Sequence, residues 1–149
     1  GVLISPRHVL TAAHVVGNAE PSEVAFVLHP GSPAPLTLPA EAVTRFPGAA
    51  FPYDDLAIVQ LQTPVPSGVP AYPIRAQPPA AAQTITLVGY GGSGNGDMGP
   101  SVGASSSVKR AGRNRIDAVV ATLDDSGRTS AFFVFDFDGP AGNGSTGGP

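Results

Sequence analysis

Cysteine is absent from this 149-residue sequence, which excludes disulfide bonds and thiolate metal ligands. The absence is neutral on compartment, because many exported bacterial proteins also lack cysteine. No apolar run approaches the roughly 20 residues that a membrane-spanning helix needs. The sequence also lacks an initiator Met, a positively charged leader and a cleavage site, and it opens within an apparent strand, so we expect an excised piece of a longer protein.

Dense basic clusters are missing as well. The chain carries 8 Lys and Arg against 11 Asp and Glu, a net charge of −3, and its one local concentration of basic residues lies between 109 and 115. A nucleic-acid partner is therefore not expected. The run Gly91-Gly92-Ser93-Gly94-Asn95-Gly96 lacks a following helix and a Lys-Ser/Thr pair, so it does not predict a phosphate cradle. We expect neither a cofactor nor a metal.

Helical periodicity is the third absence. No stretch holds an apolar helical period across three turns, whereas 19 Gly and 17 Pro are scattered between short apolar runs. This pattern predicts an all-β fold of many short strands joined by turns. Besides the two phrases described next, the expected strands are 23–29, 36–38, 41–46, 84–91, 107–110, 116–123 and 130–137. We expect strand 36–38, which lies between prolines, to be an edge, and 91–106 to be a mobile surface loop.

One phrase near the start combines apolar strands with a histidine. Residues 1–14 read Gly-Val-Leu-Ile-Ser-Pro-Arg-His-Val-Leu-Thr-Ala-Ala-His. They predict a strand, a turn at Ser5-Pro6, a second strand, and a small-residue turn that presents His14. A single histidine in such a place is more often a hydrogen-bonded core or rim residue than a catalytic one. A catalytic role for His14 therefore depends on matching features elsewhere in the chain.

A second phrase places an acid at the mouth of an apolar strand. Residues 53–61 read Tyr-Asp-Asp-Leu-Ala-Ile-Val-Gln-Leu. Because Asp is disfavoured inside strands, Asp55 is either a turn residue facing water or a buried carboxylate that orients an imidazole. The next eighteen residues, 62–79, hold six prolines and are not expected to form a continuous ladder or a helix.

Together these phrases resemble the trypsin/chymotrypsin-like serine peptidases. The matching features are Thr-Ala-Ala-His ending at His14, Asp-Leu-Ala-Ile-Val beginning at Asp55, and Val-Gly-Tyr-Gly at 88–91. The chain has Val15 where animal members carry a Cys. The resemblance implies two six-stranded antiparallel β-barrels with the active site in the crevice between them. We expect an N-terminally truncated first barrel at 1–61, a proline-rich linker at 62–83, and an incomplete, C-terminally truncated second barrel at 84–149.

The resemblance also implies roles for these residues. His14 would be the general base and Asp55 the carboxylate that orients it in a Ser-His-Asp mechanism acting on polypeptide substrates. A secreted or periplasmic location is the corresponding expectation.

The tail departs from the family's Gly-Asp-Ser-Gly-Gly-Pro motif. Residues 144–149 read Gly-Ser-Thr-Gly-Gly-Pro, which puts Thr146 at the nucleophile position, Ser145 in place of the Asp, and Gly144 as an oxyanion donor. Pro140 falls where the family shapes its specificity pocket. The tail is therefore the loop of an inactive relative, a working Thr variant, or a mimic of a motif that lies beyond Pro149.

We favour the mimic, and hence a serine endopeptidase represented by a fragment that is inactive alone. The alternative is a catalytically silent relative that uses the same cleft as a binding module. A third option is a β-rich structural domain with an accidental histidine.

Overall fold

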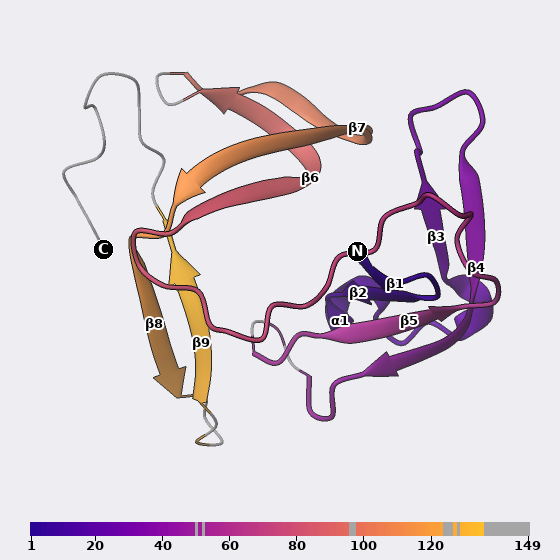
Figure 1. Ribbon diagram of the computed structural model, residues 1–149, viewed down its shortest axis with the longest axis horizontal. Coiled ribbons are helices and arrows are strands. Elements are labelled where there is room, and N and C mark those ends of the chain that lie inside the picture. Colours follow the sequence, from indigo (N-terminus) through magenta and orange to yellow (C-terminus); the bar gives the residue numbers. More distant parts are fainter. Residues whose placement is uncertain (50, 52, 96–97, 124–126, 128, 136–149) are drawn as a thin grey trace. The chain divides into compact units, whose positions relative to one another are not determined.

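The computed structural model describes residues 1–149 except 50, 52, 96–97, 124–126, 128 and 136–149. The chain divides into two compact units. The first contains Gly1–His29 and Pro33–Ala76, and the second contains Pro30–Ser32 and Gln77–Pro149 (Figure 1). No helix in the described part of the chain has the length and apolar character needed to cross a bilayer.

The first unit is built on one curled, five-stranded sheet. Its strands follow the spatial order β1-β2-β5-β4-β3, and each neighbouring pair is antiparallel (Figure 1). The bounds are β1 Val2–Ser5, β2 His8–Thr11, β3 Ala25–Leu28, β4 Leu36–Arg45 and β5 Ala57–Leu61. The predicted all-β class is confirmed.

Alternating side chains of this sheet form the hydrophobic core. In β5, Ala57, Val59 and Leu61 are buried, whereas Ile58 points to the more exposed side. This period of two is what a strand with one solvated face produces. The inward residues of the other strands join the same cluster, which includes Leu3, Val9, Leu38 and Ala40.

Two short helical segments interrupt the strands. The α-helix α1 spans Ala13–Val16 and the 3₁₀-helix η1 spans Pro21–Glu23. The sequence predicts a small-residue turn that presents His14, so the single α-helical turn that carries this residue is a correction. A segment this short has almost no helical period to read, because four residues complete little more than one turn.

Strand β4 corrects two further expectations. The predicted strands 36–38 and 41–46 are one ten-residue strand, and it lies inside the sheet rather than at an edge. Residues 36–39 pair with β3 and residues 40–45 pair with β5, so Pro39 stands where β4 changes partner. The missing N–H of Pro39 therefore costs little, and its carbonyl still accepts a hydrogen bond from Gln62 N at 3.0 Å.

The second unit consists, in its described part, of two separate antiparallel hairpins. Strands β6 (Thr84–Asn95) and β7 (Gly99–Arg115) form one, and β8 (Ala118–Leu123) and β9 (Thr129–Val134) form the other. The predicted loop at 91–106 is wrong, because β6 and β7 extend through it. Register shifts beside Gly91, whose φ is +135°, let the glycine-rich stretch continue as irregular strand.

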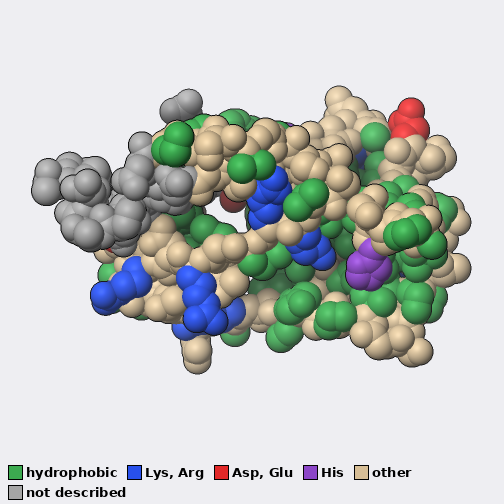
Figure 2. Space-filling view, turned by 90° about the horizontal axis from the view of Figure 1, so that it is seen from above, with side chains coloured by type: hydrophobic (Ala, Val, Ile, Leu, Met, Phe, Trp, Pro, Cys, Tyr) green, Lys and Arg blue, Asp and Glu red, His purple; other side chains and the backbone are tan. Residues whose placement is uncertain are grey.

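Large hydrophobic side chains of these hairpins remain at the surface. Figure 2 shows hydrophobic side chains exposed over much of the visible face. In the second unit they include Val88, Tyr90, Val119 and Phe133, whereas Ile116 is buried. A two-stranded sheet has too little area to bury its own apolar face, and within the described residues the second barrel is incomplete.

The proline-rich stretch contains no helix or strand, as predicted. Its first part nevertheless packs on the β1–β2 hairpin. Val65 is buried in the core and its N–H donates to Pro6 O at 2.8 Å, and Tyr72 N donates to Leu3 O at 2.8 Å.

Truncating Leu61 tests whether this core holds the first unit together. Leu61 is 0% exposed, so Leu61→Ala is expected to lower the free energy of unfolding by about 2–5 kcal/mol. Ile58 lies in the same strand and is 38% exposed, so Ile58→Ala should cost less than about 1 kcal/mol. Chemical denaturation of the two variants measures both values. Equal losses would show that β5 does not present one face to a core.

Candidate active site

The pairing of β2 with β5 brings His14 and Asp55 together. In this antiparallel pair Thr11, the last residue of β2, lies opposite Ala57, the first residue of β5. His14 follows β2 by three residues and Asp55 precedes β5 by two, so both reach the same edge of the sheet. Two residues that are 41 positions apart in the sequence thus come into direct contact.

Asp55 accepts hydrogen bonds from His14 through both of its carboxylate oxygens. Oδ2 lies 2.5 Å from His14 Nδ1, and Oδ1 accepts the backbone N–H of His14 at 2.8 Å. The hydrogen bond from the His14 side chain is the main cause that holds the pKa of Asp55 below its ordinary value of 3.8, and the backbone bond adds to it. A carboxylate that stays ionised and accepts from Nδ1–H leaves Nε2 of the neutral ring without a proton.

The two side chains differ in their exposure to solvent. The Asp55 side chain is 13% exposed, whereas the His14 side chain is 56% exposed. Among the described residues, no hydrogen bond involves His14 Nε2. The ring is therefore fixed on its inner side and accessible on its outer side, the arrangement that a general base requires.

Small residues explain why the chain can present the imidazole in this way. Ala13 and Val16 are buried on the inner side of α1, which leaves His14 on the outer side. Gly17 ends the helix with φ of +47°, and its N–H donates to Ala13 O at 2.9 Å. Glycine adopts this backbone region without the steric cost that a Cβ imposes.

A tight turn aims the carboxylate of Asp55. Asp54 has φ of +49°, and its carbonyl accepts the N–H of Leu56 at 2.7 Å. Asp and Asn tolerate the left-handed region better than most residues, so the first acid of the pair shapes the backbone while the second contacts the histidine.

A recess of about 380 Å³ adjoins the imidazole; we call it the histidine recess. It is lined by the His14–Asp55 pair, by Gly17 and Asn18 after α1, and by residues of the β4–β5 connection. Phe51 of this connection is 75% exposed and meets the His14 ring edge-on, with centroids 5.4 Å apart and an interplanar angle of 80°. Such edge-to-face contacts are weakly stabilising.

Sequence reasoning missed two residues of this recess, Phe51 and Arg45. Phe51 lies in an irregular connection, and Arg45 is a single cation at the end of a strand, so no motif or periodicity marks either one.

The tail residues cannot be placed in the site. Gly144, Ser145 and Thr146 lie outside the described residues, as does Pro140. The nucleophile and oxyanion positions therefore stay predictions. In the described part of the chain, no group of three or more His, Cys, Asp or Glu side chains is arranged to hold a metal ion.

The sequence also matches a known protein family. Residues 1–149, the whole chain, match the family model of the trypsin-like peptidase domain. The chain belongs to this family, and the resemblance stated from the sequence is confirmed. Family membership makes it a peptidase-type domain, for which polypeptides are the substrate class. A comparison with curated proteins found no match.

Replacing Asp54 tests the turn that aims Asp55. Asp54→Asn and Asp54→Gly should each cost less stability than Asp54→Val, because Asn and Gly adopt positive φ readily. Asp54→Val should cost about 1–2 kcal/mol of unfolding free energy, since a β-branched side chain is strained there. Denaturant titration of the three variants makes the comparison. If Asp54→Val kept the wild-type stability while Asp54→Gly lost stability, the side chain of Asp54 and not its backbone conformation would determine stability at this position.

Acid should remove the stabilisation that Asp55 provides. Its pKa is lower in the folded state, so the contribution is fully present above the ordinary value of 3.8 and is lost as pH falls through the folded-state pKa. Wild type should therefore unfold at a higher urea concentration than Asp55→Asn at neutral pH, and the two midpoints should converge in strong acid. A difference between the two urea midpoints that does not change with pH would contradict the lowered pKa of Asp55.

Proposed function

We propose that this protein is a serine-type endopeptidase in which His14 is the general base and Asp55 orients it. The observation that carries the proposal is the double contact of Asp55 with the ring nitrogen and the backbone N–H of His14, at 2.5 and 2.8 Å. An acid–imidazole pair with an exposed outer nitrogen is the part of a nucleophilic triad that activates a hydroxyl.

The proposed reaction proceeds in two halves. A hydroxyl oxygen attacks the carbonyl carbon of the peptide bond while His14 Nε2 takes the hydroxyl proton, and Asp55 stabilises the imidazolium that results. The imidazolium gives this proton to the leaving amine as the C–N bond breaks, which leaves an acyl-enzyme. A water molecule then attacks the ester, His14 takes a proton from the water, and its return to the departing hydroxyl frees the carboxylic acid and restores the enzyme.

The identity of the hydroxyl is part of the proposal. Thr146 is one candidate, with Gly144 as an oxyanion donor, but the extra methyl of Thr restricts χ1 and occupies space that the acyl group needs. We therefore favour a serine beyond Pro149 in the complete gene product. The secreted or periplasmic location stays a prediction.

Mutation of His14 and Asp55, with His8 as the control, tests the proposal. In the complete gene product, His14→Ala should abolish hydrolysis of a mixed peptide library, because the general base is lost. Asp55→Asn should lower kcat by about 10⁴-fold, the scale known for triad chemistry, because an Asn favours the wrong tautomer. His8 lies in β2 and bonds to Ser5 rather than to Asp55, so His8→Ala is the matched control and should retain turnover. Hydrolysis that survives in His14→Ala would refute the mechanism.

Labelling with a fluorophosphonate separates the enzyme from a silent relative. An active enzyme takes up the label at one hydroxyl in a His14-dependent manner, and mass spectrometry identifies whether that residue is Thr146 or a serine. A protein that binds peptides yet takes up no label would instead be the inactive relative that the substitutions at Ser145 and Thr146 suggest.

A further inference from the structure

The histidine recess combines apolar walls with one cation. Phe46, Ala49 and Phe51 supply carbon surface, and Arg45, the last residue of β4, supplies a guanidinium. Among the described lining residues the one carboxylate is Asp55, and both of its oxygens already accept hydrogen bonds from His14. Within this described lining, the positive charge of Arg45 therefore has no second carboxylate to pair with.

Arg45 is held in place by neutral groups. Its Nε donates to the carbonyl of Gly17, and one Nη2 hydrogen donates to the carbonyl of Ala19 at 2.8 Å. Both acceptors belong to the segment that follows α1. A guanidinium has five N–H donors, so donors of Arg45 remain free after these bonds are made. In the described part of the chain, no carboxylate forms an ion pair with Arg45.

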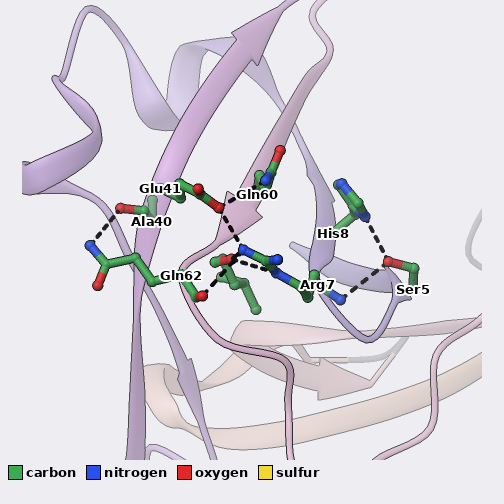
Figure 3. A network of polar contacts seen from close by, with 8 residues as sticks. Ser5, Arg7, His8, Ala40, Glu41, Gln60 and Gln62 are labelled. Carbon is green, nitrogen blue, oxygen red and sulfur yellow. Dashed lines mark hydrogen bonds and ion pairs between the residues drawn. The ribbon is translucent and has the colours of Figure 1, made fainter.

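Arg7, in the turn between β1 and β2, is an arginine of the same unit that has a structural role (Figure 3). It ion-pairs with Glu41 at 2.5 Å and donates to the carbonyls of Leu61 and Gln62 at the end of β5. Gln60 donates to the same Glu41 oxygen at 2.8 Å. The charge of Arg7 is thus compensated by Glu41, whereas no carboxylate of the described residues compensates the charge of Arg45.

We propose that Arg45 is a specificity-determining residue that binds the side-chain carboxylate of an Asp or Glu next to the scissile bond of the substrate. The carboxylate accepts hydrogen bonds from the free N–H groups of Arg45, and the methylene groups of the substrate side chain contact the apolar walls. This inference rests on the proposed peptidase function, because that function puts a peptide beside His14.

The net charge of the molecule indicates that a preference for an acidic peptide arises from local contact and not from long-range attraction. The chain has a net charge of −3, which repels an acidic peptide at a distance. Asp55 also lies in the recess, but its charge is engaged by the imidazole and its side chain is only 13% exposed. The preference for an acidic residue therefore depends on direct contact with Arg45 and should weaken as salt increases.

A pair of fluorescent peptides that differ only by Glu against Gln tests the proposal, with both ends blocked and binding followed by anisotropy. Wild type should bind the Glu peptide about tenfold more tightly, as expected for one charge-assisted, partly exposed contact. Arg45→Gln should bring the ratio close to one. The exposed Arg75 lies in the same unit and does not line the recess, so Arg75→Gln should keep the wild-type ratio.

Two additional binding measurements control for a folding defect of the variant and for a different ligand. Arg45→Lys keeps the charge and should retain part of the Glu preference even where the Gln variant unfolds. A Gln peptide with a free C-terminal carboxylate should bind no better than the blocked one, and tighter binding would mean that the recess holds chain ends instead. An equal Glu preference in wild type and a folded Arg45→Gln would overturn the proposal, and so would no preference in wild type.

The two proposals fail in distinguishable ways. In the complete gene product, an absence of peptide hydrolysis together with an Arg45-dependent Glu preference in binding would refute the peptidase function alone. Hydrolysis that depends on His14 but shows no Glu preference would refute the role of Arg45 alone.

Discussion

The contact between the Asp55 carboxylate and His14 is the interaction on which the rest of the site depends. It exists because the antiparallel register of β2 and β5 sets Thr11 opposite Ala57 and so ends both strands at one edge of the sheet. A shift of this register by one residue would move Ala57, Val59 and Leu61 out of the core, so the same packing that stabilises the sheet fixes the distance between the acid and the imidazole. Core and site are thus determined together.

The site divides its work between a sheltered acid and an accessible base. The Asp55 side chain is largely sheltered, and its hydrogen bonds from the side chain and the backbone of His14 lower its pKa, whereas the His14 side chain is exposed and accessible to a ligand. Phe51 contacts that ring in a T-shaped arrangement, and the histidine recess beside it combines apolar surface with the charge of Arg45. In the proposed mechanism, the orientation of the base and the choice of ligand therefore depend on different parts of the first unit.

Much of this could be predicted where a local pattern coincides with a local structure. The strand after Asp55 and the hairpin before His14 follow from apolar runs bounded by turns, and both are present. Prediction failed where pairing with a strand distant in the sequence determines the structure. Pro39 suggested an edge strand, but it lies at the point where β4 stops pairing with β3 and begins to pair with β5. The glycine- and serine-rich stretch at 91–106 resembled a loop because its pairing comes from the opposite strand of a long hairpin. Arg45 and Phe51 reach the site only through tertiary packing.

The protonation of the His14 ring is the most direct test of the central claim. The nitrogen NMR shifts of a selectively labelled His14 distinguish a ring protonated at Nδ1 from one protonated at Nε2. The account predicts that neutral His14 carries its proton on Nδ1, facing Asp55, and that Asp55→Asn abolishes this preference. A neutral ring protonated at Nε2 in the wild-type protein would contradict it.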